Sequence, residues 1–108
     1  MNLPSEIFGD VIVVHTPEEL TGDHADALPR FLTGLERHNV VLDLDNTETI
    51  DSGGLTALVE SRDHLLELDG DVKIATTNKT NRKILEITRL DDELEVFDSV
   101  IEAVKSYH

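Results

Sequence analysis

Residues 40–55 read VVLDLDNTETIDSGGL and pass from an apolar run, through a polar loop, into the start of a helix. The run 40–45 has the composition of a largely buried strand, and 46–49 is a loop of polar residues. After the two glycines the apolar residues recur at helical spacing, which predicts an amphipathic helix over 52–68. Its inward face is predicted to carry Leu55, Leu58, Val59, Leu65 and Leu66.

Ser52 stands at the predicted start of this helix. We predict that it is the N-cap, its hydroxyl accepting a hydrogen bond from an amide one turn into the helix. A phosphate on the same hydroxyl would meet the positive end of the helix dipole, beside the flexible Gly53 and Gly54. The position can therefore serve both as a cap and as a modification site.

Strands and helices alternate along the rest of the chain. Residues 7–8 and 11–15 predict a hairpin through Gly9-Asp10. A helix is expected over 23–37, with Pro29 in its first two turns, and a strand over 72–75. A helix capped by Thr77 or Asn78 should follow and end near Thr88, before a strand over 94–97. The last helix is expected to be capped by Asp98-Ser99, with Val100, Ile101 and Val104 facing inward. This order predicts an α/β fold with a mixed, mostly parallel central sheet, an N-terminal antiparallel hairpin and about four helices.

The composition predicts one domain spanning residues 1–108. The hydrophobic fraction of 39% can supply its core. We expect the following side chains to be buried: Leu42, Leu44, Leu55, Leu58, Val59, Leu65, Ile74, Leu85 and Phe97.

Charge and cysteine content narrow the choice of partners and compartment. The formal net charge of −14 disfavours direct binding to nucleic acid or to acidic membranes. No apolar run approaches the roughly 20 residues of a membrane helix, the start does not resemble a signal peptide, and there is no cysteine. We therefore expect a cytoplasmic protein without membrane insertion or disulfides. The one basic segment contains Lys79, Arg82, Lys83 and Arg89, for which solvation of a helix is the simpler interpretation and partner docking the second.

Catalytic and metal-binding patterns are weak. A nucleophile elbow needs a glycine two residues before the serine, where this chain has Ile50. Nothing selects one of the five histidines for a catalytic triad, and Gly53-Gly54 does not continue as a phosphate-binding loop. The groups Asp23-His24-Asp26 and Glu60-His64-Glu67 are typical of solvated helix faces. We therefore expect no catalytic residue, metal ligand, cofactor or enzymatic activity.

The strand over 40–45 also resembles the strand of a response-regulator receiver that ends in a phosphorylated aspartate. Asp43 or Asp45 would then be the acceptor. A receiver binds Mg²⁺ through acidic residues after its first strand and uses a lysine after its last. Here HTPEE stands at 15–19, and no lysine directly follows Phe97. This reading remains a minor alternative.

The combination of Leu42-Asp43-Leu44 with Asp51-Ser52-Gly53-Gly54-Leu55 resembles the STAS domain family, which contains the bacterial anti-sigma factor antagonists. Residues 82–90 and 97–98 are similar to the family's third helix and last strand, so the resemblance covers roughly residues 40–105. The first third matches less well, because HTPEELT at 15–21 stands where many members have a turn similar to Gly-Glu-Leu-Asp. That difference concerns the partner surface more than the fold.

The resemblance implies a phosphorylation-regulated interaction module. Its unmodified form would bind an anti-sigma factor that is also a serine kinase; this kinase would phosphorylate Ser52 with its own ATP and Mg²⁺, and a phosphatase would reset it. Partner contacts are expected at Asp51, Ser52, Gly53, Gly54 and Thr56. The alternative is a STAS domain that works without phosphorylation, as a stressosome-like scaffold or as the soluble subunit of a lipid-transport ABC system. The sigma factor and the oligomeric state stay open.

Overall fold

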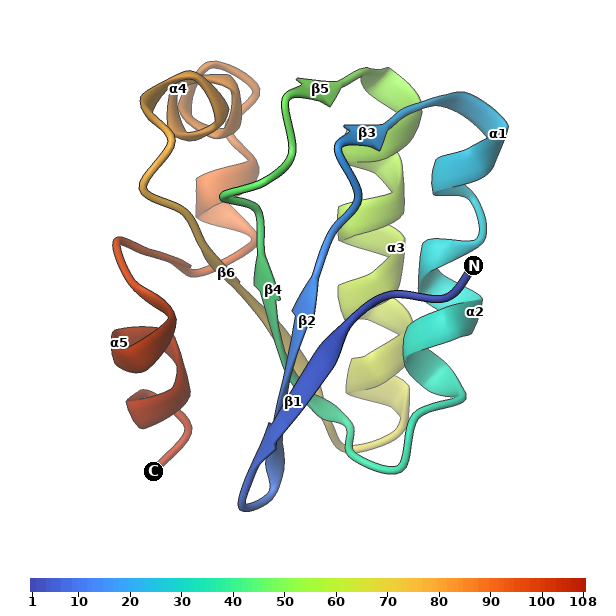
Figure 1. Cartoon of the computed structure of the whole chain (residues 1–108), viewed down its shortest axis with the longest axis vertical. Coiled ribbons are helices and arrows are strands. Elements are labelled where there is room, and N and C mark those ends of the chain that lie inside the picture. The colour runs from blue at the N-terminus through green and yellow to red at the C-terminus, as the bar shows by residue number, and fades with distance from the viewer.

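A computed structural model describes residues 1–108, which form a five-stranded mixed sheet in the order β1-β2-β4-β6-β7 (Figure 1). The strands are β1 Ser5–Phe8, β2 Val11–His15, β4 Asn39–Asp43, β6 Asp71–Ala75 and β7 Val96–Phe97. Strand β1 runs antiparallel to β2, and the other neighbours are parallel. The predicted hairpin and the predicted α/β class are thus confirmed.

Helices lie on both sides of this sheet and beyond the carboxyl ends of its central strands (Figure 1). They are α1 Gly22–Ala25, α2 Leu28–Thr33, α3 Ser52–Glu67, α4 Lys79–Ile87 and α5 Val100–Lys105, with a 3₁₀ turn, η1, at Leu90–Asp92. Helices α1 to α3 lie on one side and α5 on the other. A small parallel ladder of β3 Glu19–Leu20 and β5 Thr49–Ile50, which the sequence did not indicate, lies just before α1 and α3.

The central strands are largely apolar because both faces are covered. Along β4, Val40 and Leu42 face the larger core of 17 buried residues, whereas Val41 faces a smaller core of five beneath α5. Burial on both faces replaces the usual polar alternation by a continuous apolar run. This explains the composition of the stretch that predicted the strand.

The helix predicted over 23–37 is present as two short helices, and this is a correction. Helix α1 ends at Ala25, and α2 restarts at Leu28 with Pro29 in its first turn. Proline has no amide hydrogen and its ring clashes with the carbonyl four residues earlier, so a continuous helix cannot run through it without a kink. At the start of a new helix the missing donor costs little.

The buried face of α3 is rotated from the predicted one. Leu58 and Leu65 are buried as expected, but Leu66 is 44% exposed and Val59 is only half-buried. The inward stripe instead contains small residues, Gly54, Ala57 and Ser61, which apolar periodicity does not register. The other predicted core residues divide similarly: Leu42, Leu44, Ile74 and Leu85 are buried, whereas Leu55 and Phe97 are half-buried. In α5, Ala103 is buried and Ile101, predicted inward, is exposed.

Candidate modification and partner-binding site

The N-cap of α3 is Asp51, so the prediction of Ser52 as the cap is wrong. Asp51 has extended backbone geometry, and its Oδ1 accepts a hydrogen bond from the Gly54 amide at 2.9 Å. Ser52 is the first helical residue. A carboxylate one position earlier satisfies the amide that the serine hydroxyl was expected to bind, and that hydroxyl is left free.

The same carboxylate also binds α1. The Gly22 amide donates to Asp51 Oδ2 at 2.9 Å and to Oδ1 at 3.1 Å. Gly22 is the first residue of α1 and has a positive φ of +53°, a conformation that glycine adopts without strain. Asp51 therefore joins the starts of two helices, and its predicted contact with a partner would come on top of this internal role.

The two glycines after Ser52 fit tightly into the domain itself. A Cβ on Gly54 would lie 2.1 Å from the Leu20 carbonyl oxygen, so no larger residue fits at the close approach of α3 to β3. A Cβ on Gly53 would lie 3.2 Å from backbone atoms of Gly22. Gly54 is buried and serves internal packing, and its predicted partner contact stays a prediction. The predicted partner contact of Gly53, which is half-buried, stays a prediction.

Ser52 is exposed, and its hydroxyl makes no hydrogen bond within the domain. Ser61 is buried, Ser99 caps α5, and Ser106 interacts with Lys73. Ser5, on the edge strand β1, is the other exposed serine with a free hydroxyl. Among the serines, only Ser52 combines a free hydroxyl with the first turn of a helix, where amides lack intrahelical acceptors.

An open hollow of about 400 Å³ adjoins Ser52. It lies between α3 and the chain that runs from the end of α4 into η1. Thr56, predicted to contact a partner, lies in this hollow one turn after Ser52. Thr88 and Leu90 form part of the opposite wall; we did not predict them as site residues, because only the tertiary structure brings them to α3. The full lining is Ser52, Leu55, Thr56, Val59, Glu60, Thr88 and Leu90.

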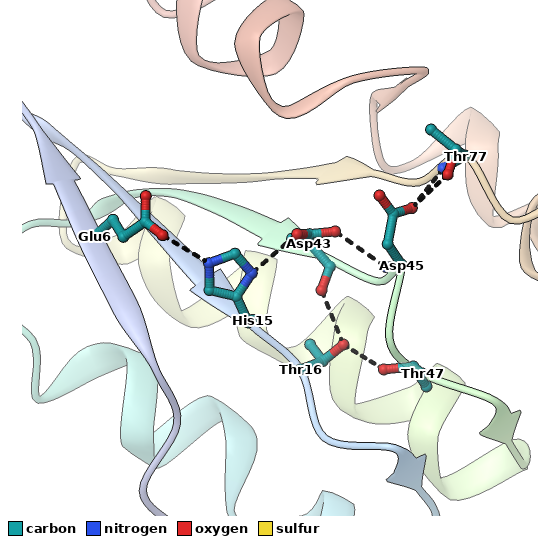
Figure 2. Close-up of polar contacts among 7 residues, drawn as sticks. All are labelled: Glu6, His15, Thr16, Asp43, Asp45, Thr47 and Thr77. Atoms are coloured by element: carbon teal, nitrogen blue, oxygen red, sulfur yellow. Dashed lines mark hydrogen bonds and ion pairs between the residues drawn. The ribbon is translucent and has the colours of Figure 1, made fainter.

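A polar network fixes the loop that leads into this site (Figure 2). The hydroxyls of Thr16 and Thr47 are hydrogen-bonded to each other, and Thr16 also donates to the Asp43 carbonyl. On the β6 side, Asp45 Oδ1 accepts from the amide and the hydroxyl of Thr77, at 2.6 and 3.1 Å. From α4, Asn81 Nδ2 donates to the Thr47 carbonyl at 2.8 Å. The loop before α3 is thus held by Thr16 directly after β2, by the loop after β6 and by α4.

His15 belongs to the same network and lies between two carboxylates (Figure 2). Its Nδ1 is 2.9 Å from Asp43 Oδ2, and its Nε2 is 3.3 Å from Glu6 Oε1. Asp43 Oδ1 accepts from the Asp45 amide, so both oxygens of this buried carboxylate are occupied. That arrangement does not favour Asp43 as a receiver-type acceptor, and no histidine is hydrogen-bonded to Ser52. No group of three potential metal-binding side chains converges in the structure.

The STAS domain family model matches residues 2–103 of this chain. The chain therefore belongs to the STAS domain family, as its resemblance implied. Among curated proteins it is 24% identical over 106 residues to the Thermotoga neapolitana protein named "Putative anti-sigma factor antagonist TM1081 homolog", with 94% of each chain covered.

Solved structures share the fold at low sequence identity. An anti-sigma factor antagonist from Mycobacterium paratuberculosis superposes with a TM-score of 0.83 at 21% identity, over 97% of this chain and 92% of that one. The anti-sigma factor antagonist SpoIIAA in its unphosphorylated form superposes with a TM-score of 0.73 at 15% identity, over 98% of this chain and 96% of that one. A sulfate transporter family protein from Wolinella succinogenes superposes with a TM-score of 0.77 at 18% identity, over 94% of this chain and 87% of that one. None of the helices of the present chain has the length and apolar character needed to cross a bilayer.

Proposed function

We propose that this protein is a phosphorylation-regulated anti-sigma factor antagonist, which binds an anti-sigma factor with serine kinase activity while Ser52 is unmodified. The observation that carries the proposal is the free hydroxyl of Ser52, exposed at the first residue of α3 and bordering an open hollow. Membership of the STAS family and the similarity to proteins named as anti-sigma factor antagonists support it.

The partner brings the nucleotide, and this chain brings the acceptor. The kinase transfers the γ-phosphoryl group of ATP, held with Mg²⁺ in its own site, to Ser52 Oγ; the hydroxyl loses its proton, and ADP leaves. A phosphatase resets the protein by hydrolysing the ester to serine and inorganic phosphate. This chain needs no cofactor or metal for either step.

The folded domain can accommodate the phosphate. The amides of Ser52 and Gly53 make no backbone hydrogen bond outside the helix, and first-turn amides have no partner inside it. Together with the helix dipole they favour a negative group there, whereas the neighbouring Asp51 carboxylate opposes it. A partner surface built against a neutral hydroxyl would have to desolvate a group of about −1.5 to −2 charge. Phosphorylation therefore weakens partner binding and leaves the fold unchanged.

The test is phosphorylation with the cognate kinase and ATP, followed by phosphopeptide mapping and calorimetry. We expect one phosphate, on Ser52, and none after Ser52→Ala. The phosphorylated protein and Ser52→Asp should bind the anti-sigma factor more weakly, with an unchanged circular dichroism spectrum, and Ser52→Ala should bind like the wild type.

Ser5 supplies the internal comparison, since its hydroxyl is also exposed and free. Modification at Ser5 with Ser52 untouched would contradict the site. Equal affinity of the phosphorylated and unmodified proteins would contradict the switch.

A STAS role without phosphorylation is the second candidate, either as a stressosome-like scaffold or as the soluble subunit of a lipid-transport ABC system. The structural likeness to a sulfate transporter family protein supports a transport connection. The neighbouring genes separate the two: a kinase-type anti-sigma factor supports the first candidate, and an ABC transporter operon supports the second.

A further inference from the structure

The hollow beside Ser52 is one end of a longer trough. A second, smaller hollow of about 190 Å³ lies next along α3 and shares Val59 with the first. One wall is α3 from Ser52 to Asp63, which at 1.5 Å rise per residue is about 16 Å long. The other wall is the segment from Thr88 to Leu94. We name this feature the α3 trough.

The larger hollow of the α3 trough has an apolar floor, whereas charged side chains make up most of the lining of the smaller one. Leu55 and Leu90 pack partly against the main core, but Val59 is not among the side chains packed against it. Ile87, directly before this wall, is 71% exposed. An open apolar hollow next to an exposed apolar side chain offers a place where an apolar side chain of a partner can be buried.

The rim of the α3 trough is acidic. Glu60, Asp63 and Glu93 line it and are exposed, and η1 adds Asp91 and Asp92 beside Leu90. Two cations stand on the walls of the α3 trough: Arg62 is paired with Asp71 at 3.1 Å, and Arg89 makes no ion pair. An occupant with positive charge is therefore complementary to this rim.

We infer that the α3 trough docks a basic amphipathic segment of a protein partner, with an apolar side chain in the hollow beside Ser52 and lysine or arginine side chains over the rim. A second copy of this chain is a poor occupant, because each copy carries a formal net charge of −14. The carboxylates of the rim likewise repel nucleic acid and acidic lipid. The inference rests on the proposed function, since it describes the partner surface that meets the acceptor serine.

A basic partner is compatible with inhibition by a phosphate. Glu60 lies eight residues after Ser52, about 12 Å along the helix, which exceeds the Debye length of about 8 Å at physiological salt. Cations placed over the far rim are thus largely screened from a phosphate on Ser52. The phosphate instead acts at the mouth of the hollow, where the apolar side chain must enter.

Three synthetic peptides of about 14 residues test the inference by amide chemical-shift titration. One has leucines at i, i+3, i+4 and i+7 with lysine elsewhere; the second replaces lysine by glutamate; the third has the composition of the first with the leucines scrambled. We expect the first alone to shift the amides of Ser52, Thr56, Val59 and Leu90. Equal binding of the scrambled peptide would reduce the effect to net charge, and equal binding of the glutamate peptide would remove the role of the rim; either result overturns the inference.

Two lysine substitutions on the same helix sharpen the test. Val59→Lys places a cation on the trough floor and should weaken the first peptide by at least about tenfold. Leu66→Lys, at an exposed position outside the trough, should keep the affinity within about twofold. Unchanged binding of Val59→Lys would contradict the docking site. Because the peptides involve no kinase, failure of Ser52 phosphorylation leaves this result intact, and the two proposals fail separately.

Discussion

At the residue scale, one carboxylate organises the start of α3. Asp51 accepts from the amides of Gly54 and Gly22, whereas the neighbouring Ser52 hydroxyl binds nothing in the domain. The structural and the proposed regulatory roles therefore fall on adjacent residues. Because Ser52 is not the cap, the proposed modification of its hydroxyl would leave the helix start intact.

Replacing each of these two residues by alanine separates the roles. Asp51→Ala should lower the free energy of unfolding by about 0.5 to 2 kcal/mol, the usual range for a lost N-cap, and the lost bond to Gly22 favours the upper end. Ser52→Ala should change it by no more than about 0.5 kcal/mol, as expected for a surface substitution. Urea denaturation of both variants measures this. A larger loss for Ser52→Ala than for Asp51→Ala would show that the serine is the cap after all.

Gly54 offers a second prediction at this scale. Gly54→Ala would force a methyl group against the Leu20 carbonyl oxygen, at 2.1 Å if nothing moved. Overpacking of this kind costs typically about 1 to 3 kcal/mol, and the backbone of β3 or α3 must shift to relieve it. Gly34→Ala is the control, because its Cβ would meet the nearest atom at 3.5 Å. Thermal unfolding should show a lower midpoint for Gly54→Ala alone, and equal midpoints would contradict the close approach.

At the element scale, α5 is held against the sheet by the residues that directly follow it, Ser106 and Tyr107. The Tyr107 hydroxyl donates to the Val40 and Asp71 carbonyls, at 2.7 and 3.0 Å. The Lys73 ammonium lies 4.2 Å from the centroid of the Tyr107 ring and donates to the Ser106 carbonyl at 3.1 Å. These contacts compensate for the short length of α5, which covers the smaller core.

The stabilisation that Tyr107 provides should decrease at alkaline pH. Burial, assisted by the negative charge of Asp71, raises the pKa of Tyr107 well above its ordinary value of 10.0. The folded state thus holds the tyrosine proton more tightly than the unfolded state. The contribution of Tyr107 to the free energy of unfolding is therefore complete below the ordinary tyrosine pKa of 10.0 and decreases as the pH rises above it. The loss approaches about 1.4 kcal/mol per pH unit.

Tyr107→Phe isolates this contribution. Denaturation midpoints of the wild type and of the variant are compared at about pH 8 and about pH 11, on either side of the ordinary tyrosine pKa. The lysines titrate in both proteins, so the difference between the two pH dependences reports Tyr107. We expect the wild type to lose more stability than the variant. Identical losses would show that Tyr107 ionises as freely in the folded state as in the unfolded one.

At the scale of the whole molecule, the charge balance opposes compaction. A formal net charge of −14 is confined to a body of 31 × 27 × 23 Å. Such self-repulsion destabilises the folded state, and salt screens it, because the Debye length shortens from about 30 Å at 0.01 M to about 8 Å at 0.15 M.

The unfolding midpoint should therefore rise when salt is added over this range. Sodium chloride and choline chloride should act alike, since screening depends on ionic strength and not on the identity of the cation. A midpoint that falls, or one that rises with sodium only, would contradict general screening. The second result would point to a specific ion site instead.

The sequence by itself determined the order of elements and the family. Buried strand, polar loop and Asp-Ser-Gly-Gly-Leu are contiguous, and hairpin and cap signals are local, so neighbouring residues suffice to predict them. The cap of α4 is Asn78, one of the two candidates that the sequence offered, and the cap of α5 is Ser99 of the predicted pair Asp98-Ser99.

The tertiary structure decided what depends on residues far apart in the chain. Asp51 rather than Ser52 became the cap of α3, and the amide of Gly22, 29 positions away, holds the same carboxylate in place. The buried face of α3 is set by the close packing of the small residues Gly54, Ala57 and Ser61, which hydrophobic periodicity does not detect. The hollow beside Ser52 exists because Thr88 and Leu90 are packed opposite α3. Propensity and spacing act over a few residues, whereas a cap shared between two helices and a docking surface require the folded chain.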